Sequence, residues 1–439
     1  MQYFSDPAMG LRGVIRVPGD KSISHRALML AAVAHGTTLI DGLLEGEDCL
    51  ATAQILRELG VDIRKLRPGI WMVPGQGWDA LVPPSGRRLD VGNSGTSMRL
   101  LAGLLGSGRI PLCLDGDASI RRRPMARILS PLQKMGVNIL GSAGAKAPLI
   151  ISPAEHVTGI DYRMPVASAQ VKSSILFAGL RAWGITRVYE SAPTRDHTER
   201  MLRAFDQPLR QMGHYVELEG GHPLQTPGEI RIPADFSSAM FFIVAATIIP
   251  GSEILLTDVG INPTRTAALT LLRQMGADIT LSHARFWSGE PVADLIVRHH
   301  SLEGIRVSPD LVSGAIDEFP ALAVAAACAH GPTLITAAGE LRVKESDRIL
   351  AIVEGLRAVG IRAVAYPDGM LIHGATIHGG SVNSFGDHRI AMAFAIAGAA
   401  SEKGVRVRNC ASVTTSFPDF LACAQGLNMP VRETASHDS

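Results

Sequence analysis

Near the start of the chain stands Lys21-Ser-Ile-Ser-His-Arg-Ala-Leu-Met-Leu-Ala-Ala32, a polar residue followed by an apolar run rich in small side chains. The pattern returns five times, with starts at Asn93, Ser168, Asp235, Asp317 and Asp387. By subtraction, the five intervals between these starts are 72, 75, 67, 82 and 70 residues. A repeat of this length governs the fold, because each unit can bury its apolar face only against its neighbours.

Each run predicts a buried helix, because its residues are apolar nearly all round. Asp, Asn and Ser side chains accept hydrogen bonds from the free N–H groups of a first helical turn. We therefore expect N-caps at Asn93, Ser168, Asp235, Asp317 and Asp387. A second recurring marker, Leu-x-x-apolar-Gly, predicts the end of an amphipathic helix, with a glycine of positive φ just beyond it. These glycines are Gly60, Gly136, Gly213 and Gly276.

Short β-branched runs follow the helices, so one unit should contain about four strands and two helices. A unit of this size buries too little surface to be stable alone, and two lobes of three units are the economical arrangement. The lobe junctions are indicated by two similar segments, Val14-Ile-Arg-Val-Pro-Gly-Asp20 and Glu229-Ile-Arg-Ile-Pro-Ala-Asp235. Both are expected to be strands ended by proline, at paired crossings. The expected lobes are 1–18 plus 234–439, and 19–233.

The composition excludes several classes of protein. With 42 basic and 41 acidic residues the net charge is +1, so no global field attracts polyanions. Five cysteines without Cys-x-x-Cys spacing argue against a disulfide framework and a zinc site, and favour a reducing compartment. The first residues lack a signal-peptide core, and the alanine-rich helices are too short to span a bilayer. We expect a cytoplasmic protein.

Positive residues gather near the predicted helix starts. Helix N-termini favour anions through their dipoles and free N–H groups, whereas a cation there is unfavourable without an anionic ligand. A lone Lys or Arg is usually a solvated surface residue, and that alternative applies to each one singly. Taken together they predict a ligand with several negative charges. The residues are Lys21, Arg26, Arg99, Lys172 and Arg389, with Arg121, Arg122, Arg123, Arg195, Arg342, Lys344 and Arg348 in nearby loops.

Two acidic residues interrupt this cationic set. Asp317 stands at the head of a predicted helix, and Glu345 lies between Lys344 and Arg348. A helix cap and a surface ion pair are the structural alternatives. In a cationic cleft, both are candidates to accept and deliver protons. His197 and His388 are weaker candidates, since a single histidine is more often structural.

Eight motifs at these positions resemble one family, over essentially the full chain. They are Pro18-Gly-Asp-Lys-Ser-Ile-Ser-His-Arg26, Gly92-Asn-Ser-Gly-Thr96, Arg123-Pro, Ser168-Ala-Gln170, Asp317-Glu-Phe-Pro, Arg342-Val-Lys-Glu-Ser-Asp-Arg348, Gly386-Asp-His-Arg389 and Ser416-Phe-Pro-Asp419. The chain resembles the 5-enolpyruvylshikimate-3-phosphate synthases, enolpyruvyl transferases of the shikimate pathway. The resemblance implies two lobes, each an inside-out α/β barrel of three repeats, with the active site in the cleft between them.

The resemblance also implies the reaction. Phosphoenolpyruvate and shikimate 3-phosphate would give the enolpyruvyl ether and phosphate by addition and elimination, without metal or organic cofactor. The partners would be these small anions, with no nucleic acid and no membrane, and a monomer is expected. Gly95 is retained where highly glyphosate-tolerant members of the family carry Ala.

By motif, shikimate 3-phosphate would be held by Lys21, Ser22, Arg26, Ser168, Gln170, Arg195, Asp317 and Lys344. Phosphoenolpyruvate would be held by Lys21, Gly95, Arg123, Gln170, Arg348 and Arg389. Asp317 would be the base at the 5-hydroxyl, with Glu345 and Lys21 handling the proton at C3. Two positions depart from the pattern of many members, Thr415 in place of a lysine and Glu340 in place of an asparagine.

Two alternative functions suit the sequence less well. The sister enzyme, which transfers enolpyruvyl to UDP-N-acetylglucosamine, typically has a cysteine in the loop before its Arg-Pro, whereas Gly116-Asp-Ala-Ser-Ile-Arg-Arg-Arg-Pro124 has none. A non-catalytic phosphate-binding or RNA-end-binding protein should show basic stripes with interleaved aromatics. The balanced charge and 5% aromatic content do not suit that reading.

Overall fold

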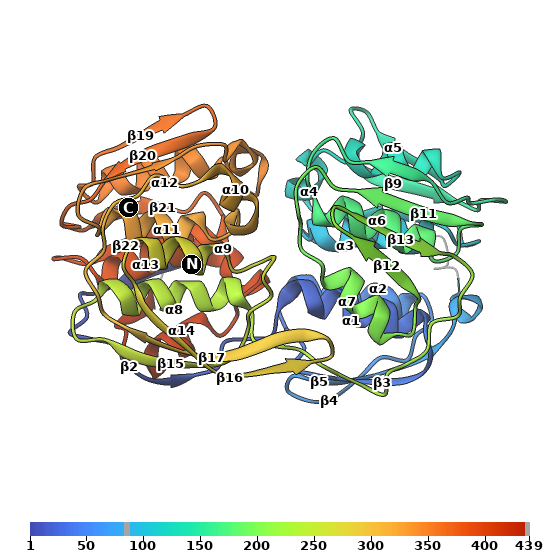
Figure 1. The fold of residues 1–439 in the computed structure, drawn as a ribbon, viewed down its shortest axis with the longest axis horizontal. Coiled ribbons are helices and arrows are strands. Elements are labelled where there is room, and N and C mark those ends of the chain that lie inside the picture. Colours follow the sequence, from blue (N-terminus) through green and yellow to red (C-terminus); the bar gives the residue numbers. More distant parts are fainter. Residues whose placement is uncertain (83–87, 435–439) are drawn as a thin grey trace. The chain divides into compact units, whose positions relative to one another are not determined.

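The computed structural model describes residues 1–82 and 88–434. The chain divides into two compact units. Unit 1 comprises Met1–Pro18, Pro233–Phe286 and Pro291–Ser439, and unit 2 comprises Gly19–Ile232 and Trp287–Glu290. Both units mix helices with sheets (Figure 1). The α/β class predicted from the repeats is confirmed.

Unit 2 contains three four-stranded sheets of one design. Their strand orders are β14-β3-β5-β4, β6-β7-β9-β8 and β10-β11-β13-β12. In each sheet the first two strands are parallel and the remaining pairs antiparallel. The strands are β3 (His35–Asp41), β4 (Arg64–Arg67), β5 (Ile70–Gln76), β6 (Arg88–Asp90), β7 (Leu112–Asp115), β8 (Asn138–Ser142), β9 (Lys146–Ser152), β10 (Asp161–Arg163), β11 (Ile185–Tyr189), β12 (Leu209–Met212), β13 (Tyr215–Glu219) and β14 (Glu229–Arg231).

Unit 1 repeats this design with one reduced sheet. Its strand orders are β16-β17-β15-β2, β21-β22-β1-β23 and the three-stranded β18-β20-β19. In the three-stranded sheet, Arg306 forms an isolated parallel bridge with Leu334 of β18. The strands are β1 (Gln2–Ser5), β2 (Arg12–Ile15), β15 (Glu253–Gly260), β16 (Asp278–Trp287), β17 (Glu290–Arg298), β18 (Pro332–Ile335), β19 (Ala363–Tyr366), β20 (Gly369–His373), β21 (Gly380–Asn383), β22 (Val405–Arg408) and β23 (Val431–Thr434).

Each unit has an inner set of three helices with sheets around them (Figure 1). In unit 2 these are α1 (Lys21–Val33), α3 (Gly95–Gly106) and α6 (Ala169–Gly179); in unit 1 they are α8 (Phe236–Ile248), α11 (Phe319–Ala327) and α13 (His388–Ala399). All six come from the repeated apolar runs, and every residue of α8 is buried. The inner helices therefore form the core of each unit, and the sheets form its outside.

The second helix of each repeat is more amphipathic and lies against a sheet. These helices are α2 (Glu47–Glu58), α5 (Ala126–Lys134), α7 (His197–Ala204), α9 (Ala267–Gln274), α12 (Arg348–Ala358) and α14 (Phe420–Gly426). Shorter pieces are α4 (Ala118–Arg122), α10 (Pro309–Val312), η1 (Trp78–Ala80), η2 (Ser313–Ala315), η3 (Gly339–Val343) and η4 (Cys410–Thr415).

The first strands of two repeats are exchanged between the units. Strand β2 precedes α1 in the sequence but pairs with β15 in unit 1. Strand β14 precedes α8 but pairs with β3 in unit 2. Both strands end shortly before a proline, Pro18 or Pro233, and the unit boundary falls at each of these prolines.

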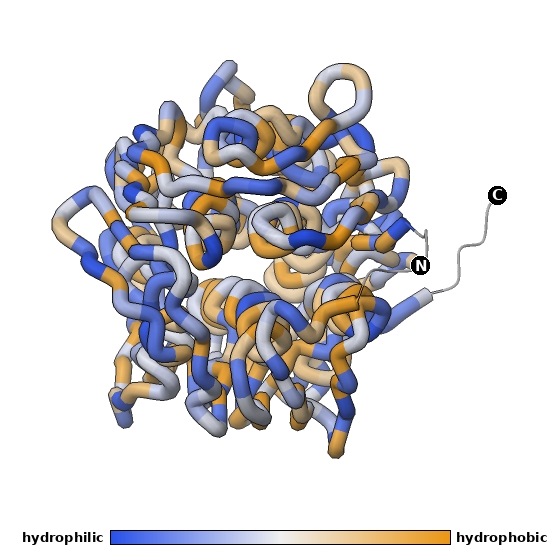
Figure 2. The backbone as a smooth tube through the Cα atoms, turned by 90° about the vertical axis from the view of Figure 1, so that its right-hand side faces the viewer, coloured by the Kyte–Doolittle hydropathy of each residue, from blue (hydrophilic) through white to orange (hydrophobic). Residues whose placement is uncertain are grey.

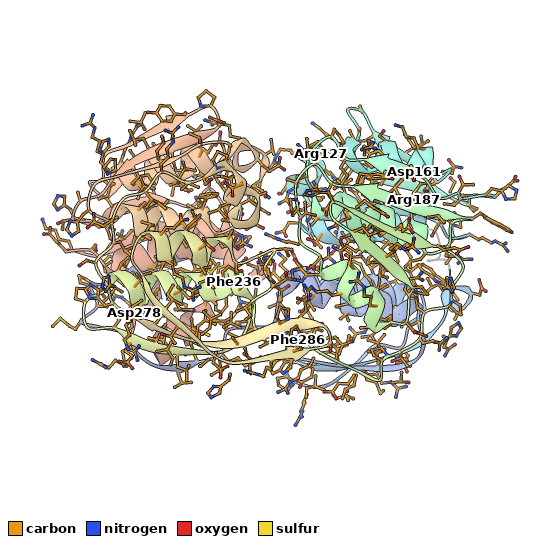
Figure 3. All side chains as sticks on the ribbon, viewed as in Figure 1. Arg127, Asp161, Arg187, Phe236, Asp278 and Phe286 are labelled. Carbon is orange, nitrogen blue, oxygen red and sulfur yellow. The ribbon has the colours of Figure 1, made fainter. Side chains whose placement is uncertain are left out.

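The outer faces carry polar side chains between apolar ones, and blue and orange segments alternate along the outer chain in Figure 2. Strand β4 is exposed along its whole length. On the outside, Arg187 on β11 lies 3.3 Å from Asp161 on β10, whereas Phe236 is buried on the inner helix α8 (Figure 3).

In the described part of the chain, no helix combines the length and hydropathy needed to cross a membrane.

Most of the expected N-caps are confirmed. The side chains of Ser168, Asp235 and Asp387 accept hydrogen bonds from the first turns of α6, α8 and α13. The expectation at Asn93 is wrong by one residue, since Ser94 is the N-cap and accepts from Ser97 N at 3.0 Å. Either residue type suits the position.

The N-cap expected at Asp317 is also wrong. Helix α11 begins at Phe319, and Glu318 occupies the N-cap position without a side-chain cap bond. Ile316 and Glu318, on either side of Asp317, have helical backbone angles (φ −56°, ψ −37° and φ −94°, ψ −10°), so the chain turns before α11 and does not enter it from an extended N-cap. The carboxylate of Asp317 is therefore available to other groups.

One of the expected helix ends is wrong as well. Gly213 lies in the turn between β12 and β13 and does not end a helix. Helix α7 ends earlier, where Asp206 adopts φ 63° and Gln207 N donates to Leu202 O at 2.9 Å. Gly60, Gly136 and Gly276 do follow helices and have positive φ, as expected.

Candidate active site

The guanidinium of Arg348, the first residue of α12, organises the polar cluster of unit 1. Its side chain is 1% exposed. Nη1 lies 3.3 Å from Oδ1 of Asp317, Nη2 lies 2.7 Å from Oε2 of Glu345, and Nε lies 2.8 Å from Oδ2 of Asp387. One buried cation thus contacts both carboxylates that the sequence singled out.

The charges in this cluster support one another. Burial acts to lower the pKa of Arg348, but Asp387, Glu345 and Asp317 outweigh it and the pKa is raised. Burial likewise acts to raise the pKa of Asp387, but Arg348 outweighs it and the pKa is lowered. Arg348 and Asp387 are therefore an ion pair in the folded protein.

Asp317 sits in the turn before α11, between cations of two other segments. Lys344 Nζ lies 3.5 Å from its Oδ1, and Arg389 Nη1 donates to its backbone oxygen at 3.3 Å. The neighbouring Glu318 is 1% exposed and accepts a hydrogen bond from Ser237 of α8. The buried contact of Glu318 with Ser237 thus holds the turn in place. The neighbouring side chain, that of Asp317, contacts Lys344 and Arg348.

In unit 2, Lys21 is the first residue of α1 and forms an ion pair with Asp48 of α2. Asp48 is buried, and the lysine side chain is 20% exposed. Asp48 was not foreseen from the sequence, because it belongs to no motif and lies on another helix. It keeps the lysine ammonium beside the N-terminus of α1.

Arg26 lies one turn further along α1 and is 3% exposed. Its guanidinium donates to Thr198 Oγ1 at 2.6 Å, Ser173 Oγ at 2.7 Å and Ser22 O at 2.8 Å. All three acceptors are neutral oxygens. A buried guanidinium without a carboxylate on its fork is suited to bind an anion.

Gly95, Gln170 and two arginines meet where α3 approaches α6. Arg99 Nη1 donates to Gln170 Oε1 at 2.8 Å, and Gln170 Nε2 donates to Thr96 Oγ1 at 3.1 Å. A methyl group on Gly95 would lie 2.8 Å from Nη1 of Arg99 and 2.8 Å from Nη1 of Arg123. Gly95 therefore allows both guanidinium groups to approach the start of α3.

The remaining expected residues of unit 2 lie at the starts of α1 and α6 or just before α7. Ser168 caps α6, Ser22 lies in the first turn of α1, and Arg195 stands two residues before α7, where its charge lowers the pKa of Arg26. Lys172 is different, because it is fully buried and paired with Glu199 and Glu190 at 2.6 and 3.0 Å.

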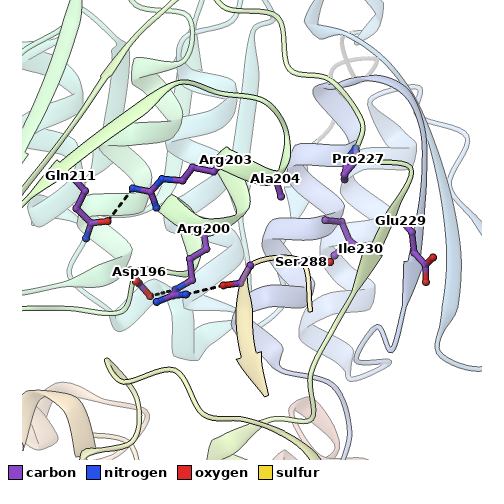
Figure 4. A pocket seen from close by; sticks show the side chains of 10 residues that line it. Asp196, Arg200, Arg203, Ala204, Gln211, Pro227, Glu229, Ile230 and Ser288 are labelled. Carbon is purple, nitrogen blue, oxygen red and sulfur yellow. Dashed lines mark hydrogen bonds and ion pairs between the residues drawn. The ribbon is translucent and has the colours of Figure 1, made fainter. Parts of the chain in front are cut away.

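A pocket of about 520 Å³ lies on another part of unit 2 (Figure 4). Arg200 bridges it, with Nε 2.9 Å from Asp196 and Nη1 2.8 Å from Gly289 O. None of the expected site residues lines it, so its size alone does not make it the active site. Its lining is Asp196, Arg200, Arg203, Ala204, Gln211, Pro227, Glu229, Ile230, Ser288 and Gly289.

Within residues 1–82 and 88–434, no three His, Cys, Asp or Glu side chains are grouped so that they could hold a metal ion. The carboxylates of unit 1 surround a guanidinium instead. Fold and residues together define a two-unit α/β protein of repeated design, with cations suited to anionic ligands and two carboxylates suited to proton transfer.

Comparison with known proteins places this class more narrowly. The family model of EPSP synthase (3-phosphoshikimate 1-carboxyvinyltransferase) matches residues 6–423. A 3-phosphoshikimate 1-carboxyvinyltransferase of Alkalilimnicola ehrlichii is 54% identical, covering 97% of this chain and 95% of the relative. One of Halorhodospira halophila is 53% identical, covering 98% and 97%.

The solved structures agree. An EPSP synthase from Acinetobacter baumannii superposes with a TM-score of 0.90 at 45% identity, covering 99% of this chain and 100% of the other. The chain belongs to the EPSP synthase family. The resemblance found in its motifs is thereby confirmed.

Proposed function

We propose that the protein transfers the enolpyruvyl group of phosphoenolpyruvate to the 5-hydroxyl of shikimate 3-phosphate. The 5-hydroxyl loses its proton and its oxygen bonds to C2, while C3 gains a proton. C3 then loses a proton as the bond between C2 and the phosphate oxygen breaks, and the leaving phosphate takes up a proton. The products are the enolpyruvyl ether and inorganic phosphate, and no net proton is taken from the enzyme.

The observation that carries this proposal is the contact of Arg348 with both Asp317 and Glu345. The reaction needs one group to accept the hydroxyl proton and another to deliver a proton at C3. Asp317 is the base and Glu345 the proton carrier, assisted by Lys21. Arg348 sets the two carboxylates at fixed places around one cation.

Each substrate has its own binding site, and Lys21 and Gln170 belong to both sites. The shikimate 3-phosphate site consists of Lys21, Ser22, Arg26, Ser168, Gln170, Arg195, Asp317 and Lys344. The phosphoenolpyruvate site consists of Lys21, Gly95, Arg123, Gln170, Arg348 and Arg389. The buried guanidinium of Arg26, bonded only to neutral oxygens on its fork, supports an anion in the first site.

The proposal extends to the two lobes, the oligomeric state and the cellular compartment of the protein. The lobes are 1–18 plus 234–439 and 19–233, and each holds part of the machinery. The protein works as a monomer in the cytoplasm. Its five cysteines are thiols, which suits a reducing compartment, and each unit closes an apolar core within one chain.

The test is phosphate release from phosphoenolpyruvate. Release should require shikimate 3-phosphate and should not occur with shikimate or UDP-N-acetylglucosamine. Asp317→Asn should slow it by about 10²–10⁴, whereas Asp310→Asn, the same change at an exposed position, should leave it unchanged. Release that is independent of shikimate 3-phosphate would overturn the proposal.

A further inference from the structure

Arg26 is held by side chains that no motif of the sequence brought forward. Its Nε donates to Thr198 Oγ1 at 2.6 Å and its Nη2 donates to Ser173 Oγ at 2.7 Å. Both hydroxyl residues are fully buried. Ser173 belongs to α6 and Thr198 to the first turn of α7, so three helices converge on one guanidinium.

The hydrogen bonds among these groups run in one direction. Ser173 donates its hydroxyl proton to Ala169 O at 2.7 Å. The 2.6 Å contact between the two hydroxyls is therefore a donation from Thr198 to Ser173. Thr198 Oγ1 then has its lone pairs directed at Arg26, and each hydroxyl uses its single proton. The arrangement admits one orientation of the guanidinium.

The first turn of α7 is itself anchored on both sides of Thr198. His197 Nδ1 lies 2.7 Å from Oε1 of Glu290. Glu199 lies 2.6 Å from the buried ammonium of Lys172. Burial acts to lower the pKa of that lysine, but Glu199 and Glu190 outweigh it and the pKa is raised. Burial raises the pKa of Glu199 even beside Lys172, but the 2.6 Å contact holds on geometry alone. A shift of Thr198 would disturb both buried contacts.

The fork that results still has capacity for a ligand. An arginine side chain has five N–H donors, and three are used by Thr198, Ser173 and Ser22, which leaves two. Burial lowers the pKa of Arg26 to about 10; Glu199 and Asp20 act against this without outweighing it, and Arg195 adds to the lowering. An anion placed against both arginines would relieve this cost.

We propose that Thr198 and Ser173 are positioning residues, which orient the Arg26 guanidinium so that its two remaining N–H groups meet the shikimate 3-phosphate. The inference rests on the proposed function, which places Arg26 in that site. It adds two hydroxyls that do not touch substrate and that act through Arg26.

The decisive variant is Thr198→Val, which keeps the shape and removes the hydroxyl. Arg26 Nε then loses its acceptor, and hydrogen bonds to charged groups are strong enough that a loss of about tenfold or more is expected. Titration calorimetry should show shikimate 3-phosphate binding weakened by this factor. In steady-state kinetics, the KM for shikimate 3-phosphate should rise, while the KM for phosphoenolpyruvate should stay within about twofold of the wild-type value.

Three controls separate positioning from general damage. Thr198→Ser restores the hydroxyl and should bring affinity back to near the wild-type value. Thr186→Val makes the same change at another buried threonine of unit 2, whose hydroxyl has no hydrogen-bond partner in the described part of the chain, and should leave affinity unchanged. Ser173→Ala should weaken binding as Thr198→Val does, and serves if the valine variant does not fold.

Arg26→Met separates the positioning role of the two hydroxyls from the proposed shikimate 3-phosphate site. If Arg26→Met weakens shikimate 3-phosphate binding but neither Thr198→Val nor Ser173→Ala does, the positioning role is wrong and the site assignment stands. If Arg26→Met leaves binding unchanged, the proposed site itself is wrong. A folded Thr198→Val protein that raises both KM values equally would also overturn the positioning role.

Discussion

Arg348 places its Nη1 3.3 Å from Oδ1 of Asp317, so the candidate base lies against a cation that is almost fully buried. The same guanidinium contacts Glu345 and Asp387. Three carboxylates around one guanidinium carry excess negative charge. Lys344, 3.5 Å from Asp317, and Arg389, which donates to the backbone oxygen of Asp317, place further positive charge beside the cluster.

Removing this central cation should strongly destabilise unit 1. Arg348→Met leaves buried carboxylates without their partner, and breaking a buried ion pair costs about 3–5 kcal/mol. Urea unfolding measures this change in the free energy of unfolding. The matched control is Arg187→Met on β11, where the side chain is 35% exposed and the expected cost is about 1 kcal/mol or less. Equal losses in the two variants would contradict the buried pair.

The ion pair of Arg348 with Asp387 should also make stability depend on acid pH. The pKa of Asp387 is lowered in the folded protein relative to about 3.9 in an unfolded chain. Its contribution is then present above about pH 4 and is lost as the pH falls through the lower, folded value. Unfolding of wild type and Asp387→Asn in urea should differ most at pH 6 and converge toward pH 3. A constant difference would be evidence against the lowered pKa.

The repeat, the α/β class and the helix starts could be predicted because each depends on local chemistry. A short polar side chain before an apolar run marks a helix start whichever of two adjacent residues becomes the cap, as with Asn93 and Ser94. The errors arose where a distant or competing constraint decided. A turn of helical backbone angles around Asp317 moved the start of α11 to Phe319, and Asp206 ended α7 before the marker at Gly213 was reached.

In the candidate site, too, local features could be predicted from the sequence and distant contacts could not. Cations near helix starts are visible in the sequence, so Lys21, Arg26 and Arg348 could be named. Their partners could not, because Asp48 and Thr198 reach these cations from other helices. Only the packing of the helices shows that Arg26 bonds to neutral oxygens while Arg348 bonds to carboxylates. Under the proposed function, Arg26 has N–H donors left for a substrate anion, whereas Arg348 both contacts the proposed acid and base and contributes to the phosphoenolpyruvate site.

Gly95→Ala should disturb the binding of phosphoenolpyruvate and of glyphosate, its longer analogue. The added methyl group would stand 2.8 Å from guanidinium nitrogens of Arg99 and Arg123, so these side chains must shift. We expect a several-fold higher KM for phosphoenolpyruvate and a larger loss of glyphosate inhibition. The control is Gly426→Ala, where the new methyl makes an ordinary contact at 3.6 Å. Unchanged glyphosate inhibition in a folded Gly95→Ala protein would refute the close approach.

Arg123→Ala should act mainly on phosphoenolpyruvate. A charge-assisted contact is worth about 1.5–3 kcal/mol, which corresponds to roughly ten- to hundredfold in KM. The KM for shikimate 3-phosphate should change little. Arg122→Ala, at the exposed last residue of α4 and directly before Arg123, is the control and should leave both values near wild type. If only the shikimate 3-phosphate value rose, Arg123 would belong to the other substrate.

The central claim is the division of roles between Asp317 and Glu345, and deuterium exchange at C3 tests it directly. The enzyme is incubated in D₂O with both substrates under reversible conditions, and deuterium in the vinyl group is followed together with phosphate release. Asp317→Asn should lower turnover by about 10²–10⁴, because the 5-hydroxyl proton has no acceptor. Glu345→Gln should slow deuterium incorporation as well as turnover. Near-native turnover in Asp317→Asn, or unchanged incorporation in Glu345→Gln, would contradict the assignment of base and proton carrier.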